Sequence, residues 1–314
     1  MGVRGIKYVA SFLQGLHRFD PILPIFERYL ASKVYGCECL AKPVFILGAP
    51  RSGTTFLYEL LNSQFNTVYF SNLSSLLYKT PLLADWLCHD RNNKGFRGKS
   101  SYGYVDGICS PSEARAIFDY WLGKVDNNSI DRDNTNNDFA AAVSRLEQRT
   151  GRVFVAKNLN NIHRIDQLKK IFPDAIYLWI KRDPSFVAQS ILIARMNLFS
   201  NESAWFSVRP KDYQKLSKLE PEEQIAWQIR FVDEEIESKL DSHASLFEVS
   251  YHDLCSSPET ELNRIREFCI EKGVGLSFRQ GRVMPHAVTS DQIRLELSQF
   301  EKLRATVDNI VIKR

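Results

Sequence analysis

The segment 44–55, which reads VFILGAPRSGTT, constrains the fold more than any other part of the chain. An apolar run of strand type leads into a loop bounded by Gly48 and Gly53, and a helical pattern follows. Unpaired backbone N–H groups and the helix dipole make such a helix N-terminus an anion site. The spacing matches the phosphate-binding loop G-x-x-x-x-G-K-[ST], but Thr54 replaces its Lys and the nearest cation is Arg51. We therefore expect a phosphate-like ligand that is held differently from ATP.

Strand-like and helix-like segments alternate through most of the chain. Short apolar runs predict strands at 44–47, 68–70, 153–157, 175–180 and 246–251. Helical patterns predict helices at 54–61, 73–88 with an interruption at Pro81, 112–122, 138–148, 162–172, 183–195, 222–240 and 257–272. This alternation predicts an α/β fold, with a central parallel sheet and helices on both of its faces.

Several polar residues follow predicted strands, at the edge of the sheet where ligands of such folds bind. The glycine loop, Lys157, Arg182 and Tyr251 all lie at expected strand carboxyl ends. Because parallel strands end at the same edge, we expect these residues to converge on one site. This convergence is a stronger signal than any single motif.

The domain organisation is expected to be simple. A chain of 314 residues is long enough for one large α/β domain, so we predict a single domain over residues 1–314. Residues 1–40 predict an N-terminal helical extension. Residues 90–110, rich in Gly, Ser, Asn, Lys and Arg, predict a lid loop, and residues 275–314 form a weakly patterned C-terminal tail.

Composition and charge exclude some classes of protein. The net charge of +4 gives no argument for nucleic acid but suits an anionic cofactor. No apolar run approaches the roughly 20 residues of a membrane span, and the N-terminus does not resemble a signal peptide, so a cytoplasmic protein is expected. The six cysteines include no C-x-x-C pair, and we predict reduced thiols and no metal site.

Four segments together resemble the sulfotransferase family that uses 3′-phosphoadenosine 5′-phosphosulfate (PAPS). They are GAPRSGTT at 48–55, KNLN at 157–160, FPDAIYLWIKRDP at 172–184 with VAQS at 187–190, and YHDL at 251–254. The resemblance implies a P-loop-NTPase-like three-layer sandwich. It also implies in-line transfer of a sulfuryl group from PAPS to a hydroxyl or amine, and a carbohydrate is one candidate acceptor.

The resemblance assigns roles to individual residues. The 5′-phosphosulfate is expected on Arg51, Ser52, Gly53, Thr54 and Thr55, which offer backbone N–H groups and hydroxyls at a helix N-terminus. The remaining expected cofactor ligands are Arg182 and Ser190 for the 3′-phosphate, Tyr251 for the adenine and, in a tail that covers the cofactor, Arg282.

Lys157 and Arg51 are the expected catalytic cations, because the leaving phosphate oxygen gains negative charge in a loose transition state. The moving sulfuryl group carries one negative charge, so no metal is expected to be required. A surface Lys at a strand end and a core tyrosine are the plain alternatives for Lys157 and Tyr251.

The general base departs from the family pattern, since Leu159 stands where one branch has His. The best candidate is Glu113, at the predicted start of a helix after the lid. Its carboxylate could instead complement the helix dipole or pair with Arg115. His163 and His89 are weaker candidates.

Two alternative functions are kept. A P-loop kinase or NTPase would require Lys at position 54 and an acidic strand end for Mg²⁺, and neither is visible. A non-catalytic nucleotide-binding homologue would bind PAPS without turnover. The sequence predicts neither the acceptor nor the oligomeric state.

Overall fold

The computed structural model describes residues 22–33, 41–88, 100–101, 104–126, 129–130, 137–240, 245–284 and 291–313. At its centre is one five-stranded sheet in which every pair of neighbouring strands is parallel. Its strands, in spatial order, are β2 (Thr67–Val68), β7 (Val153–Lys157), β1 (Val44–Leu47), β8 (Ile176–Lys181) and β9 (Leu246–Ser250). The predicted α/β fold with a parallel central sheet is confirmed.

The order of the strands fixes where a ligand can bind. Strand β1 lies in the middle, with β7 on one side and β8 on the other. The chain moves to one side of β1 through β2 and β7, and to the other side through β8 and β9. A crevice opens at such a switch point, outside the carboxyl ends of the central strands. The loops after β1, β7 and β8 therefore meet at one place.

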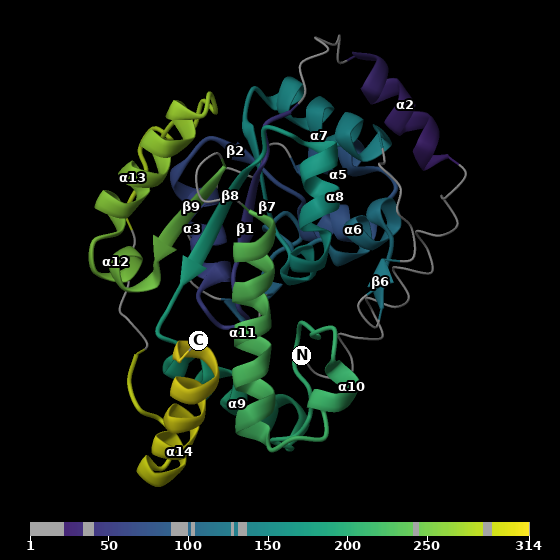
Figure 1. Ribbon diagram of the computed structural model, residues 1–314. Coiled ribbons are helices and arrows are strands. Elements are labelled where there is room, and N and C mark those ends of the chain that lie inside the picture. The colour runs from purple at the N-terminus through teal and green to yellow at the C-terminus, as the bar shows by residue number, and fades with distance from the viewer. Residues whose placement is uncertain are drawn as a thin grey trace.

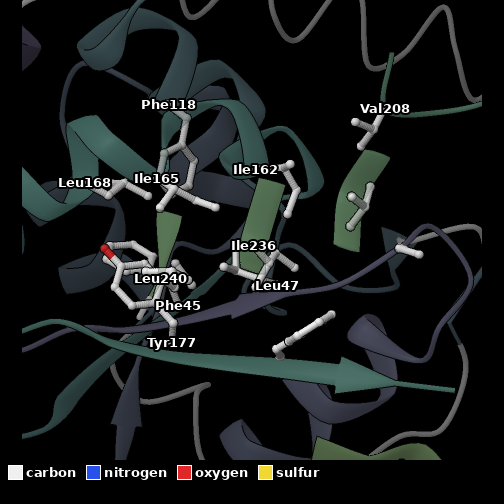
Figure 2. Packing of buried hydrophobic residues seen from close by; sticks show 14 of the residues in the cluster. Phe45, Leu47, Phe118, Ile162, Ile165, Leu168, Tyr177, Val208, Ile236 and Leu240 are labelled. Carbon is white, nitrogen blue, oxygen red and sulfur yellow. The ribbon is translucent and has the colours of Figure 1, made fainter. Parts of the chain in front are cut away.

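Alternate residues of the central strands face opposite sides of the sheet, as the period of two requires. Phe45 and Tyr177 pack into one apolar cluster beneath α8 (Ile165–Ile171) and α11 (Pro221–Lys239); Figure 2 shows both rings there. Ile46 belongs to a second cluster with residues of α3 (Thr54–Gln64) and α13 (Pro258–Glu271). Figure 1 shows these two sets of helices on either side of the strands. The sheet is thus the middle of three layers, with its strands buried on both faces.

Some of the remaining elements are predicted helices with shifted ends, and others, among them the two short ribbons, were not predicted. They are α2 (Leu23–Lys33), α4 (Asn72–Leu76), α5 (Pro81–Cys88), α6 (Arg115–Leu122), α7 (Asn137–Thr150), the 3-10 helix η2 (Leu159–Arg164), α9 (Pro184–Phe199), α10 (Tyr213–Leu216), α12 (Tyr251–Ser256), the ribbons β3 (Ser100–Ser101)–β4 (Tyr104–Val105) and β5 (Val125–Asp126)–β6 (Ser129–Ile130), α14 (Leu297–Val307) and the π-type turn η3 (Asp308–Ile312). None of the helices in these ranges is long and apolar enough to cross a membrane.

Three predictions about the ends of the chain and the lid are tested only in part. Helix α2 lies within the predicted N-terminal extension, whose other residues are outside the described ranges. Most of the predicted lid, 90–99 with 102–103, is also outside them. The weakly patterned tail contains α14, which the sequence did not predict. Its buried residues Phe300, Leu303 and Val307 lie on one face, and the helix packs against α9 and α11.

The prediction of reduced cysteines is wrong for Cys88 and Cys109, which form a disulfide with their Cα atoms 5.4 Å apart. Cys88 ends α5, and Cys109 lies in the segment that returns past the β2–α4 connection. The two cysteines are 21 positions apart in sequence, so their spacing did not predict a disulfide. Cys255 and Cys269 are free and buried. Disulfides persist mainly in oxidising environments, and the expected cytoplasmic location stays a prediction.

Candidate anion-binding site

The loop after β1 has a backbone that only certain residues adopt easily. Gly48 and Gly53 have φ values of 151° and 104°, and Arg51 has a φ of 68°. A Cβ atom on Gly48 would lie 2.9 Å from the carbonyl oxygen of Ile180 in β8. The two glycines therefore let the loop press against the neighbouring strand and turn into α3. A non-glycine residue in the left-handed region is strained, and such strain gathers at ligand sites.

The N-terminus of α3 follows the loop at the carboxyl end of β1. Gly53 is its N-cap, and no side chain caps the first turn. The Oγ atom of Ser52 is buried and has no hydrogen-bond partner among the described residues. A buried hydroxyl and uncapped N–H groups are costly unless a ligand satisfies them. Together with Thr54 and Thr55 in the first turn, they fit an anion.

Three of the predicted ligands form one chain of contacts. The Nε of Arg51 donates to the Oγ of Ser190 in α9 at 3.1 Å, and Nη1 of Arg182 donates to the carbonyl oxygen of Arg51 at 3.0 Å. Arg182 follows β8 and is buried, with 4% of its side chain exposed. The second predicted anion element is therefore in direct contact with the first.

Tyr251 has a different environment from the one expected. Its ring lies under the loop, so that a Cβ on Gly53 would come within 2.5 Å of it. The guanidinium of Arg182 stacks on the same ring at 4.6 Å. The plain alternative of a core aromatic fits this position, because the ring is buried and supports both Gly53 and Arg182. Burial raises the pKa of the neighbouring Cys255 thiol, with a further contribution from the Asp291 charge.

Arg182 carries a counter-charge that the sequence did not reveal. The Oδ1 of Asp291 accepts a hydrogen bond from its Nε at 2.7 Å and forms an ion pair with its Nη2 at 2.6 Å. The tail is fixed there by Gln189 of α9, whose Oε1 accepts from the backbone N–H of Arg294 and whose Nε2 donates to the carbonyl of Gln292. A carboxylate thus occupies the planar fork that would pair with two phosphate oxygens.

Lys157 reaches the first turn of α3 from the end of β7. Its Nζ donates to Thr55 Oγ1 at 3.2 Å and forms a short ion pair with Glu113. Lys157 is 2% exposed, whereas 32% of the Glu113 side chain is exposed. The neighbouring Asn158 donates to the Glu113 carbonyl at 2.8 Å. A buried ammonium next to an uncapped helix N-terminus adds positive charge that an anion can neutralise.

The environment of His163 argues against a role as the base. It packs on Phe231 of α11, and burial lowers its pKa to about 4, which makes it a weak base. His89 lies outside the described residues. The alternative ion pair of Glu113 with Arg115 is replaced by one between Arg115 and Asp119 at 3.2 Å.

Arg282 lies away from the group that the structure brings together. It pairs with Glu259 at 2.8 Å and stacks on Phe278, while the adjacent Arg279 donates from its backbone to Gln64. Gln64 is the last residue of α3, about 15 Å from the first at 1.5 Å per residue. The role of Arg282 as a cofactor ligand stays a prediction without support from this geometry.

The described part of the chain contains no cluster of three His, Cys, Asp or Glu residues that could hold a metal ion. The residues around the N-terminus of α3 are instead cations and hydroxyls, which suit an anion.

A family model described as "Sulfotransferase family" matches residues 43–272, which include every element that lines the crevice except the Asp291 tail. The chain belongs to the sulfotransferase family. No curated protein sequence matches it significantly.

Solved structures with some similarity to this sulfotransferase have the same family name. STF9 from Mycobacterium avium is 17% identical with a TM-score of 0.48, and the match covers 86% of this chain and 77% of the STF9 chain. STF1 from Mycobacterium tuberculosis H37Rv is 15% identical with a TM-score of 0.47, covering 95% and 86%. The sulfotransferase domain from the curacin biosynthetic pathway is 14% identical with a TM-score of 0.42, covering 86% and 98%. The membership of this chain rests on the family model.

The fit of Gly53 under the Tyr251 ring can be tested with a matched control. We expect Gly53→Ala to lower the free energy of unfolding by more than Gly151→Ala does. Both glycines have positive φ, which costs alanine about 1–2 kcal/mol, but a Cβ on Gly151 would meet nothing within 4 Å. Urea unfolding of both variants measures the difference. Equal losses would show that the loop does not press on Tyr251.

Proposed function

We propose that this sulfotransferase transfers a sulfuryl group from PAPS to a hydroxyl-bearing acceptor. One observation carries the proposal: two groups of anion-binding residues meet in the same crevice and contact each other through Arg51. A nucleotide with an anionic group on both its 5′ and 3′ sides requires two such groups. A kinase-type loop, with Lys at position 54, requires only one.

The residues at the N-terminus of α3 fit the 5′-phosphosulfate. The buried, unpartnered hydroxyl of Ser52 would donate to it, together with Thr54, Thr55 and the N–H groups of the first turn. When bound, PAPS supplies a sulfuryl group attached to a phosphate that leaves readily. Gly53 leaves room for the backbone to approach that phosphate.

Arg182 and Ser190 are the proposed ligands of the 3′-phosphate. A guanidinium pairs with two phosphate oxygens, and Ser190 is close enough to accept a hydrogen bond from Arg51. Asp291 accepts a hydrogen bond from Arg182 and forms an ion pair with it, so a phosphate that reaches Arg182 has to replace this carboxylate. Tyr251 then acts by holding Arg182 and the loop, a role that its burial supports.

Lys157 and Arg51 would stabilise the charge that develops on the leaving phosphate oxygen. Lys157 is well placed because its ammonium touches Thr55 in the first turn of α3. In a buried site such a charge acts more strongly than in water, and it needs no rearrangement at the moment of reaction. The single negative charge of the moving group means that these two cations suffice without a metal.

Glu113 is the proposed general base. Its carboxylate pairs with Lys157, and about a third of the side chain is exposed, so an acceptor hydroxyl can approach it from solvent. A proton taken from that hydroxyl would stay on the carboxylate next to Lys157. Glu113 could alternatively only orient Lys157, and the two roles predict different kinetics.

Arg182→Ala should weaken binding of PAPS about 10- to 100-fold, because two charge-assisted hydrogen bonds are lost. Binding of adenosine 5′-phosphosulfate, which has no 3′-phosphate, should change far less. Calorimetric titration of both ligands measures the ratio. Asp291→Asn is the matched variant: it keeps the shape but removes the competing charge, so it should tighten PAPS binding. Equal losses for both ligands in Arg182→Ala would contradict the 3′-phosphate assignment.

Lys157→Ala should lower turnover about 10²–10³-fold, as loss of a charge-stabilising donor does, with a smaller effect on PAPS affinity.

Glu113→Gln should lower turnover about 10²–10⁴-fold and leave PAPS affinity nearly unchanged if Glu113 is the base. Release of adenosine 3′,5′-bisphosphate with a panel of hydroxyl acceptors measures turnover. A loss of PAPS affinity in Glu113→Gln as large as that in Lys157→Ala would indicate that Glu113 only positions Lys157.

A further inference from the structure

Glu113 immediately precedes Ala114, whose backbone conformation is unfavourable for a residue with a Cβ atom. Ala114, the N-cap of α6, has φ 49° and ψ 37°, and it is buried. An L-residue with a Cβ avoids this left-handed region unless its surroundings impose it. The direction of the Glu113 side chain therefore depends on the contacts of residues 105–114, here called the Glu113 segment.

Hydrogen bonds attach the Glu113 segment to the connection between β2 and α4. The backbone N–H of Asn72 donates to Ser110 at 3.0 Å, and the Asn72 amide donates to the carbonyls of Val105 and Gly107 at 2.8 Å. The N–H of Ser112 donates to Phe70 at 2.9 Å. These contacts fix the path of the segment over the edge of the sheet.

Two buried tyrosines hold the same segment from beneath. Tyr69 donates its hydroxyl to the carbonyl of Cys109 at 3.2 Å, and Tyr58 of α3 donates to that of Ser112 at 3.4 Å. Burial raises the pKa of Tyr58, as do the nearby Tyr69 and Glu113, so its hydroxyl stays protonated and remains a donor. Asn158 completes the set at the Glu113 carbonyl.

The covalent tie in this arrangement is the disulfide of Cys88 with Cys109, four residues before Glu113. Cys88 is fully buried at the end of α5, and its sulfur lies 4.0 Å from Ser71 Oγ. Cys109 is partly exposed, so a small thiol reagent can reach the bond. The disulfide thus joins the Glu113 segment to a helix most of whose residues are buried.

We propose that the Cys88–Cys109 disulfide is a positioning device that holds Glu113 against Lys157. The proposal rests on the function proposed above, in which Glu113 is the base. Reduction by a dithiol such as dithiothreitol breaks the S–S bond with two electrons. The two protons move to the sulfurs of Cys88 and Cys109, and the dithiol closes to its own cyclic disulfide. The Glu113 segment then loses its covalent tie to α5, its hydrogen bonds alone no longer fix its position, and the contact of Glu113 with Lys157 loosens.

The test measures Lys157 directly, on the full chain and without an acceptor. Reductive methylation of lysines, followed by peptide mass spectrometry, reports how accessible each ammonium is. We expect labelling of Lys157 to rise severalfold on reduction and to fall back on reoxidation. Lys215, which is 86% exposed, should keep its labelling rate in both states. Circular dichroism checks that the fold is retained.

Variants separate positioning from general destabilisation. Cys88→Ser with Cys109→Ser should raise Lys157 labelling as reduction does, whereas Cys255→Ser, at a buried free thiol, should not. Glu113→Gln should also raise it, and adding the cysteine changes to that variant should have no further effect, because both act through one contact. A purely structural disulfide would give additive effects.

Turnover distinguishes this proposal from the proposed function. If both hold, reduction lowers turnover of PAPS at least about tenfold and leaves the affinity for adenosine 3′,5′-bisphosphate unchanged. If Lys157 labelling rises while no sulfuryl transfer occurs in either state, the positioning role stands and the proposed function fails. The positioning role is overturned if Lys157 labelling is unchanged after verified reduction, or if freshly purified protein has free thiols at Cys88 and Cys109.

Discussion

The candidate site depends on a concentration of positive charge at one end of the sheet. The N-terminus of α3 is uncapped, and Lys157, Arg51 and Arg182 converge on it from three different strands or loops. Buried cations of this kind are costly unless they are paired, and here Glu113 and Asp291 supply the pairing. Two carboxylates therefore pair with the cations of the candidate site. In the proposed function, Glu113 lies where the acceptor binds and Asp291 lies where the 3′-phosphate binds.

In the proposed function, this arrangement lets a phosphate-type loop act without its usual lysine. Position 54 is Thr, and Lys157 from β7 would supply the ammonium instead, because its Nζ lies 3.2 Å from Thr55 Oγ1. The loop cation, Arg51, instead turns toward Ser190. The consequence is a site in which one cation faces the first turn of α3 and two more link it to α9. A nucleotide with a single anionic tail would leave the second group unused.

Much of this could be predicted from the sequence, because local patterns determine it. The alternation of strands and helices predicted the parallel sheet. The positions that follow strand ends predicted that Arg51, Lys157 and Arg182 lie close together. Glu113 was identified from its place before a helix, and the structure puts it on Lys157. Long-range partners could not be predicted. Asp291 and the Cys88–Cys109 bond depend on where distant segments return, and neither has a local pattern. Arg282 belongs to a basic Gly-containing motif, but this segment contacts the far end of α3.

The proposed function requires the site to bind a nucleotide with two separate anionic groups. Calorimetric titration of the purified protein with adenosine 3′,5′-bisphosphate in EDTA, with ATP as the comparison, measures this binding. We expect tight binding of the bisphosphate without metal and weak binding of ATP, because ATP carries no 3′-phosphate for Arg182 and Ser190. Binding of ATP alone, and only with Mg²⁺, would overturn the proposed function and indicate a kinase-like use of the loop.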